Sequence, residues 1–556
     1  MQKMIKTWVK YFIIVGAFGV CINLIYLALP LYMMIVYDKV LFSFSQATLY
    51  TLSAGAMISF LAMGLMDYFQ LQIRGKIGNE LAQKTMPFVV NAMHKDAAGI
   101  VRQGYARGLE DLEILRNAVV HGKIFNFLDL PWVLIYLWIL YVIHPLVGIV
   151  AMAAVFLIAL FQILLKKLEK KRYTIADVAF GAHADYAKIC LAHAELVSGM
   201  GMLPAILAKH EGQAMKVLAV RSAADVFHFG TGAVIRSLYV TSFAAVFGVG
   251  AFVFFTDQIT AGAIFAGVVI LARLFYPLEK SLADMKASIE AMGAYKRLKQ
   301  FVSTQPLKKK LSLPRPEGKF DAQAVSLALA GKMILHNVSF ALAPGETLGI
   351  LGASSAGKTS LCKVLLGIWP AVAGKVRLDG AELAQWPEDE LGKFLGYLPQ
   401  ELALFPASVA QNISRLQEVD SEKVVRAAKK AGVHEMILKL AQGYDTKIDE
   451  TGKNLAAGQR QLISLARALY DDPKLVVLDE PHTHLDETGL RMLFYALNNL
   501  KQEKITTLVV TDRPNLLVSM DKILVIKEGQ VAMYGPSKEV INQLANTQVP
   551  QQAAGV

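Results

Sequence analysis

Six apolar segments, each long enough to cross a lipid bilayer, constrain the fold of this chain more than any other feature. A membrane-spanning helix needs about 20 mainly apolar residues. Charged residues make up only 18% of the chain, and 54% of its residues are hydrophobic, so a net charge of +12 suits a face against anionic lipid better than a nucleic-acid site. We therefore expect a membrane protein. The segments lie at 11–36, 47–67, 126–144, 146–165, 231–255 and 259–280.

The gaps between these segments alternate in length, which indicates how the chain crosses the membrane. Three gaps are short, at 37–46, 144–145 and 256–258, whereas the other two cover 68–125 and 166–230. Lysine and arginine gather before the first segment and after the fourth, and the short gaps carry almost none. The positive-inside rule then places the N-terminus, both long gaps and the C-terminal part in the cytoplasm.

The composition also predicts where domains begin and end. The long gaps contain few Gly or Pro, so we expect helical extensions, with tips near 108–116 and 199–211. The apolar run at the N-terminus could belong to a signal peptide, but it continues to about Val36 without a cleavage site, which favours an uncleaved helix. The expected parts are a six-helix transmembrane domain with two long cytoplasmic helical hairpins at 1–302, a basic, Pro-rich linker at 303–318, an α/β domain at 319–545 and a disordered tail at 546–556.

The segment GASSAGKT at 352–359 matches the phosphate-loop pattern G-x-x-x-x-G-K-[ST]. A strand-like run precedes it and a helix-like run follows, as the pattern requires. Lys358 is expected to reach the β- and γ-phosphates, and Thr359 to supply an oxygen to Mg²⁺. Backbone N–H groups at the start of the helix would bind further phosphate oxygens. The residues expected to contact nucleotide are Gly352, Ala353, Ser354, Ser355, Ala356, Gly357, Lys358, Thr359 and Ser360.

Two acids that end the apolar run LVVLDE predict the catalytic edge of the same domain. Asp479 is expected to hold Mg²⁺ through water, and Glu480 to act as general base on the attacking water. Gln400, at the end of the run GYLPQ, could contact both the metal and that water. Each pattern is common by itself and gains weight because all three share one α/β domain with a phosphate loop.

The segment LAAGQ begins a helix through small residues, so its free N–H groups could face an anion, although a purely structural helix start is the alternative. Its residues are Leu455, Ala456, Ala457, Gly458 and Gln459. Together, GASSAGKT, Gln400, LAAGQ, LVVLDE and HLDE resemble the Walker A, Q-loop, signature, Walker B and D-loop motifs of the ATP-binding cassette family. The resemblance implies a head-to-tail dimer, in which each ATP lies between one chain's Walker motifs and the other's signature.

Longer stretches resemble the PrtD-type permease/ATPases of type I secretion. Such a protein would use ATP and Mg²⁺ in the bacterial inner membrane. It would export unfolded proteins that carry a C-terminal signal, through a periplasmic adaptor and an outer-membrane channel. The stretches include LPLYMMIVYDKVLFSFSQATL (29–49), DLPWVLIYL (129–137), LGYLPQELALF (395–405) and ALYDDPKLVVLDEP (468–481).

Two motifs depart from this family's pattern. The signature is usually LSGGQ, and here Ala456 and Ala457 replace its serine and first glycine. Asp512 stands where the family's switch histidine donates to the γ-phosphate, and two nearby anions repel each other. The phosphate loop, Asp479, Glu480 and Gln400 are intact. We therefore expect ATP binding to be retained and hydrolysis to be slow.

The expected function is that of an ATP-driven exporter half-transporter, with a homodimer slightly favoured over a heterodimer. The alternatives are an ATP-binding regulatory or partner subunit of a heterodimeric exporter, and an exporter of lipids, peptides or drugs. Arg273 lies about halfway along the sixth segment, and a charge within a membrane is costly. Two interpretations of this residue remain open. It either lines a transport path or pairs with Glu279 or a neighbouring helix.

Overall fold

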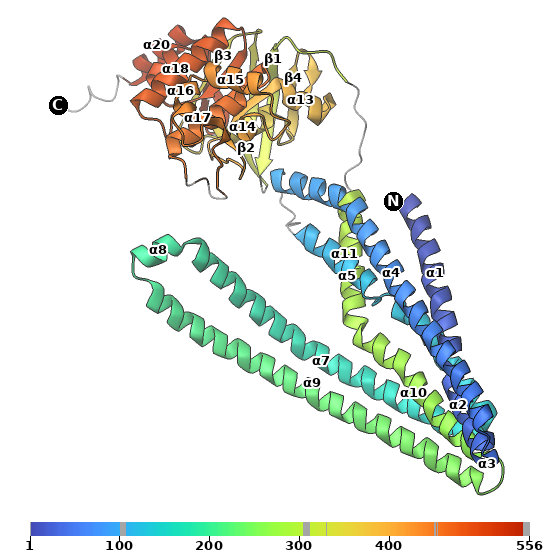
Figure 1. The fold of residues 1–556 in the computed structure, drawn as a ribbon. Helices are drawn as coiled ribbons and strands as arrows, with labels where there is room; N and C mark the ends of the chain where they lie inside the picture. Colours follow the sequence, from blue (N-terminus) through green and yellow to red (C-terminus); the bar gives the residue numbers. More distant parts are fainter. Residues whose placement is uncertain are drawn as a thin grey trace. The chain divides into compact units, whose positions relative to one another are not determined.

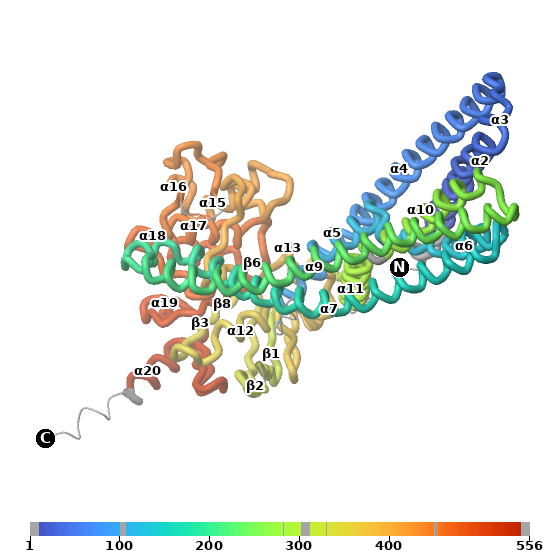
Figure 2. Tube along the Cα trace, turned by 90° about the horizontal axis from the view of Figure 1, so that it is seen from below, coloured from blue at the N-terminus to red at the C-terminus, as the bar shows by residue number. Residues whose placement is uncertain are grey.

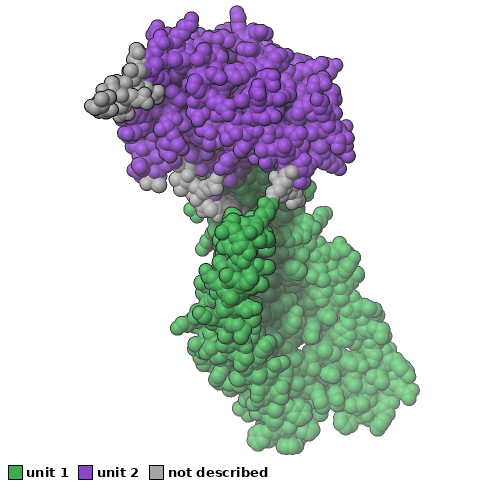
Figure 3. All heavy atoms as spheres, turned by 90° about the vertical axis from the view of Figure 1, so that its left-hand side faces the viewer, with its two compact units in different colours: residues 1–93, 106–304 green, residues 94–105, 305–556 purple. Residues whose placement is uncertain are grey.

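The computed structural model describes residues 2–99, 107–303, 312–329, 331–449, 452 and 454–548. The chain forms two compact units (Figure 3). Unit 1 comprises residues 1–93 and 106–304, and unit 2 comprises residues 94–105 and 305–556. Much of the predicted linker lies outside the described residues, and 312–319 form neither helix nor strand. The predicted disordered tail begins too early, because 546–548 still belong to the last helix, Ser537–Gln548; residues 549–556 lie outside the described residues.

Unit 1 is built from helices, and six of its helical stretches are long and apolar enough to cross a membrane, which confirms the predicted six spans. The chain is therefore a multi-pass membrane protein. The elements are α1 Gln2–Tyr26, α2 Ala28–Ile35, the π-helix η1 Val36–Val40, α3 Leu41–Ser43, α4 Gln46–Ala98, α5 Gly108–Val120, the 3-10 helix η3 Phe125–Asp129, α6 Leu130–Ile143, α7 Pro145–Ala192, α8 Ala194–Gly199, α9 Leu203–Phe254, α10 Ala261–Ala283 and α11 Met285–Ser303 (Figure 1).

Helices α7 and α9 run side by side and are joined through the short helix α8 (Figure 1 and Figure 2). They contain 48 and 52 residues, which at 1.5 Å per residue gives lengths of about 72 and 78 Å. The hydrocarbon core of a bilayer is only about 30 Å thick. Both helices therefore continue well beyond it, as predicted for the gap 166–230. The turn between them comes slightly before the predicted tip, because α9 already begins at Leu203.

Polar side chains link α7 to α9 along this pair. Glu169 is buried and accepts a hydrogen bond from the Thr231 hydroxyl. His228 Nδ1 lies 3.2 Å from Glu169 Oε1. Farther along, the Tyr173 hydroxyl donates to Asp225 Oδ1 at 2.8 Å. Buried polar groups of this kind need partners of fixed geometry, so these contacts set the register between the two helices.

The predicted turn at 144–145 is present and very tight. Pro145 starts α7, and His144 Nδ1 accepts a hydrogen bond from Leu146 N at 3.2 Å. Gly148 allows α6 and α7 to cross closely, because a Cβ atom there would lie 2.5 Å from Tyr141 Cα. Just inside this turn, α6, α7, α9 and α10 share an apolar core that includes the fully buried Tyr136.

Arg273 pairs with a neighbouring helix, the second of the two predicted readings. Its Nη2 atom donates to Asn23 Oδ1 at 2.7 Å, and its guanidinium lies 4.1 Å from the centroid of the Tyr26 ring. Asn23 is buried and also donates to Asp129 Oδ1 at 3.1 Å, while the Tyr136 hydroxyl donates to Asn23 Oδ1 at 3.2 Å. The cluster ties together α1, η3, α6 and α10. No hydrogen bond joins Arg273 to Glu279 within the described residues.

Unit 2 contains two sheets with helices around them. One sheet is antiparallel, in the order β2-β1-β4-β5, and the other follows the order β10-β9-β3-β8-β7-β6, with β9, β3, β8, β7 and β6 parallel. The strands are β1 Phe320–Leu329, β2 Lys332–Leu342, β3 Thr347–Gly352, β4 Ala373–Leu378, β5 Ala381–Glu382, β6 Leu395–Leu398, β7 Leu475–Asp479, β8 Thr506–Val510, β9 Lys522–Lys527 and β10 Gln530–Pro536.

The helices of unit 2 follow its strands, which is the α/β pattern predicted from the sequence. They are α12 Lys358–Leu365, α13 Glu388–Phe394, α14 Val409–Ile413, α15 Ser421–Lys430, α16 His434–Leu438, α17 Ala457–Ala468, α18 Glu487–Gln502, α19 Pro514–Val518 and α20 Ser537–Gln548. The strand β8 lies between β3 and β7, so the carboxyl ends of these three strands meet at one edge of the sheet.

Candidate nucleotide site

The phosphate loop connects the end of β3 to the start of α12, as the sequence predicts. Its backbone turns sharply, with left-handed φ values of 70° at Ser355 and 95° at Gly357. At Gly357 a Cβ atom would also lie 3.0 Å from Leu335 Cδ2. Lys358 Nζ donates to the carbonyl oxygens of Gly352, at 2.7 Å, and Ala353, at 3.1 Å. The loop thus holds the lysine ammonium over its own backbone, and the N–H groups at the start of α12 are available to an anion.

The two predicted acids lie at the end of β7, the second strand at this edge. Asp479 is buried, and neither of its carboxylate oxygens has a hydrogen-bond partner among the described residues. Burial raises the pKa of the Asp479 carboxyl, and this effect outweighs the lowering of the pKa by the nearby Thr359 hydroxyl and the Lys358 ammonium. A buried carboxylate without a partner is costly unless a cation neutralises it. Asp479 therefore fits a metal ligand.

Gln400 connects the phosphate loop to the predicted general base. Its amide Nε2 donates to Glu480 Oε2 at 3.0 Å, and its Oε1 lies 3.5 Å from Thr359 Oγ1. Glu480 itself adopts a left-handed backbone, with φ of 49°, directly after β7. Gln400 can therefore orient the Glu480 carboxylate, while its own oxygen lies next to that of Thr359. This arrangement suits Mg²⁺, which prefers oxygen ligands.

Strand pairing explains why residues far apart in the sequence meet here. Asp479 of β7 pairs with Val510 of β8, and Val510 pairs with Ile350 of β3. Asp512 follows β8 by two residues and therefore lies between the loops that continue from β3 and β7. Its side chain is 76% exposed, and its Oδ1 atom lies 2.9 Å from Nε2 of His482.

His482 was not predicted from the sequence. It stands two positions after Glu480, and a lone histidine in a loop gives no signal by itself. Its partner, Asp512, is 30 positions away in the numbering, and only the pairing of β7 with β8 brings the two together. The position of His482, two residues after the predicted general base Glu480, was the one indication in the sequence that this histidine belongs to the site.

The segment LAAGQ lies at the start of α17, apart from the phosphate loop. Ala456 is the N-cap and offers no side-chain acceptor, and Gln459 Oε1 accepts a hydrogen bond from Ala456 N at 3.0 Å. A Cβ atom at Gly458 would lie 3.0 Å from His484 O. Within the described part of unit 2, no hydrogen bond joins 455–459 to 352–359. The structure thus brings together all predicted site residues except this segment.

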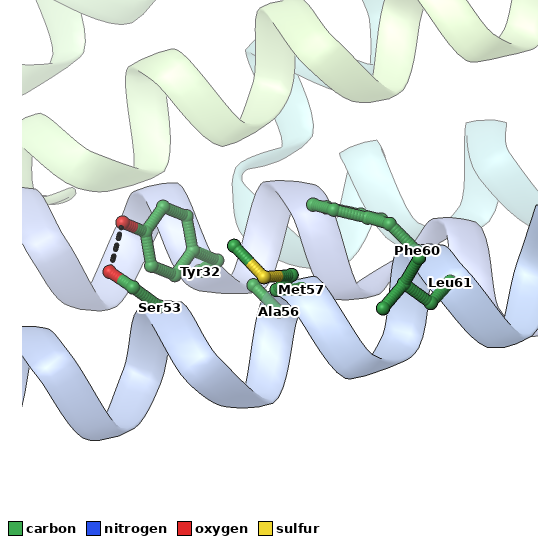
Figure 4. A pocket seen from close by; sticks show the side chains of 6 residues that line it. All are labelled: Tyr32, Ser53, Ala56, Met57, Phe60 and Leu61. Atoms are coloured by element: carbon green, nitrogen blue, oxygen red, sulfur yellow. Dashed lines mark hydrogen bonds between the residues drawn. The ribbon is translucent and has the colours of Figure 1, made fainter.

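A separate hollow lies within unit 1, between α2 and α4 (Figure 4). It has a volume of about 390 Å³, and the Tyr32 hydroxyl lies 2.9 Å from Ser53 Oγ at one end of it. Its walls are mostly apolar and belong to two membrane-crossing stretches, so it does not resemble a site for nucleotide. The lining residues are Tyr32, Ser53, Ala56, Met57, Phe60 and Leu61.

Comparisons with known proteins concern the family and the fold of the chain. The ABC transporter family model matches residues 335–483. The type I secretion system ATP-binding protein PrsD of Rhizobium meliloti is 33% identical over 542 residues, which cover 97% of this chain and 93% of PrsD. The cyclolysin secretion/processing ATP-binding protein CyaB of Bordetella pertussis is 27% identical, with 94% of this chain and 74% of CyaB covered.

The fold is similar to that of a bacterial Atm1-family ABC exporter, solved with ATP bound. The TM-score is 0.81, and the match covers all of both chains. Sequence identity is 19%, so this likeness concerns the fold alone.

Proposed function

Because this chain belongs to the ABC exporters of type I secretion systems, we propose that it exports an unfolded protein from the cytoplasm across the bacterial inner membrane. It is an exporter half-transporter, with six membrane-crossing helices and one nucleotide-binding cassette. The observation that carries the proposal is the similarity to PrsD over 97% of this chain. The resemblance to PrtD-type permease/ATPases further implies that the cargo carries a C-terminal signal and passes through a periplasmic adaptor and an outer-membrane channel.

In the cassette, ATP and Mg²⁺ would use the cluster at the edge of the parallel sheet. Lys358 and the phosphate loop would bind the β- and γ-phosphates, and Thr359, Gln400 and Asp479 would hold Mg²⁺. The metal would supply positive charge against the phosphates. Glu480, oriented by Gln400, would accept a proton from the attacking water. The unpartnered oxygens of buried Asp479 support this metal site.

Nucleotide titration of the purified full chain tests the cassette. Wild type should bind Mg-ATP, and K358A should lose most of that binding. The matched control is K363A, which removes a lysine of the same helix whose ammonium lies over the Trp369 ring instead. K363A should bind ATP as wild type does. Equal affinity of wild type and K358A would contradict the assignment.

The cargo is tested in cells that lack this gene. The medium of the deletion strain should lose one or more proteins, while the lipid composition of the outer membrane stays unchanged. Return of the same proteins with a wild-type copy, but not with K358A, ties the loss to ATP use. Changed lipids with normal secretion would instead support a lipid exporter.

A second candidate is a regulatory or partner subunit that binds ATP and hydrolyses it poorly. Ala456 at the N-cap of α17 and Asp512 at the end of β8 favour it, because neither can donate a hydrogen bond from its side chain to phosphate when Asp512 is ionised. A heterodimer with an intact partner would place one of these changes in each composite site. We place the homodimer slightly ahead, since nothing in the sequence requires a second kind of chain.

A further inference from the structure

The imidazole of His482 is held on both of its nitrogen atoms. The side chain is only 9% exposed, with Nε2 at 2.9 Å from Asp512 Oδ1 and Nδ1 at 3.3 Å from Thr511 Oγ1. The Thr511 hydroxyl oxygen also accepts a hydrogen bond from Arg513 N at 3.1 Å. A neutral imidazole satisfies all three contacts when the threonine hydroxyl donates to Nδ1 and Nε2–H donates to the aspartate.

The loop that carries Asp512 is fixed between the two halves of the phosphate site. Thr511 N donates to Ile350 O of β3 at 3.2 Å, and Glu480 N donates to Val510 O of β8 at 3.1 Å. The loop that carries Asp512 therefore lies between β3, which leads into the phosphate loop, and β7, which leads into the general base. Its surroundings are already negative, since Asp479 and Glu480 end the neighbouring strand.

An unpaired carboxylate at this place would oppose the binding of ATP. Like charges within a few ångströms repel each other. The effect is larger for ATP than for ADP, because ATP carries the additional γ-phosphate. A hydrogen-bond donor on the carboxylate reduces this repulsion and also limits where the carboxylate can move.

We propose that His482 is a positioning residue of the ATP site: its Nε2–H group binds Asp512 and offsets the charge that this carboxylate presents to the terminal phosphate. The inference rests on the proposed function, in which the cassette binds ATP. His482 acts through Asp512 and does not itself touch the nucleotide. The site thus accepts ATP even though the loop that lies between β3 and β7 carries a carboxylate.

The test compares ATP with ADP in titrations of the full chain with Mg²⁺, using wild type, H482N, D512N and the double variant H482N/D512N. H482N should weaken ATP binding about tenfold and ADP binding much less, since a hydrogen bond to a charged group is lost. The double variant should regain the wild-type ratio of ATP to ADP affinity, because the charge is absent. D512N alone should change this ratio less than about twofold, as its charge is already offset.

Several outcomes would overturn the role of His482. One is an equal loss of ATP and ADP affinity in H482N, and another is a failure of D512N to rescue H482N. A third is a tenfold gain in ATP affinity for D512N alone, which is informative even if H482N does not fold, because Asp512 is exposed. Binding by K358A equal to that of wild type would instead contradict the nucleotide site itself, so the two failures are distinguishable.

Discussion

Ala456 caps α17 without a side chain that can accept a hydrogen bond, although its backbone is already extended, with φ of −62° and ψ of 151°. A serine there could accept from a free N–H group of the first turn, and such caps contribute about 1 kcal/mol. We expect A456S to raise the free energy of unfolding of the nucleotide-free chain by about that amount, measured by denaturant titration. A456V is the control and should gain nothing, because valine is as poor an N-cap as alanine. A456S without any gain would mean that Gln459 already stabilises this end.

The same residue and Asp512 bear on the rate of hydrolysis. We expect slow turnover by the chain alone, because neither side chain donates to the terminal phosphate. Restoring one donor is worth about a hundredfold in comparable sites, so A456S/D512H should hydrolyse ATP at least tenfold faster by phosphate release. In A456S/D512H, His482 would face the introduced imidazole instead of a carboxylate. H482N should therefore be added to this double variant.

E480Q in the restored background supplies the control for this measurement. It should abolish turnover, because an amide cannot accept the proton of the attacking water. Wild type that already hydrolyses ATP as fast as A456S/D512H/H482N would show that Ala456 and Asp512 do not limit the reaction.

Among the elements, the close crossing of α6 with α7 depends on Gly148, which has no side chain. G148A would place a methyl group 2.5 Å from Tyr141 Cα, so the two helices must separate, at a cost of about 1–3 kcal/mol. We expect a lower unfolding temperature for G148A in detergent. G181A, in the same helix, meets nothing within 4 Å and should be neutral or slightly stabilising, since alanine favours helix. Equal effects of the two substitutions would contradict the close crossing.

At the scale of the whole molecule, the proposed function gives one chain half of the pathway and half of each composite site. We therefore expect the working unit to contain two chains. Native mass measurement of the purified E480Q variant with ATP should show a dimer, because blocked hydrolysis keeps the nucleotide in place.

Co-expression with an intact exporter from the same cell, followed by pull-down, tests the mixed dimer. Higher ATPase activity in a mixed dimer would reject the homodimer, and a stable monomer would reject both.

Local patterns were enough to predict much of this architecture. The six spans follow from hydropathy over windows of contiguous residues, and the phosphate loop from spacing within eight positions. What escaped prediction depends on contacts between distant segments. The cluster of Arg273 with Asn23 needs α10 to pack on α1, and the pair of His482 with Asp512 needs β7 to lie beside β8. Neither neighbour can be inferred from composition around the residue itself.

The long pair α7 and α9 has a mechanical consequence. Within both helices proline occurs only in the first turn, so neither has a proline kink in its interior. A displacement of about 5 Å at α8, carried along about 75 Å of unbroken helix, equals a tilt of only about 4°. By contrast, α4 and α10 contain Pro87 and Pro277 in their interiors, where a backbone hydrogen bond is lost. Of these four helices, α4 and α10 thus have an internal proline at which a helix bends readily, and α7 and α9 have none.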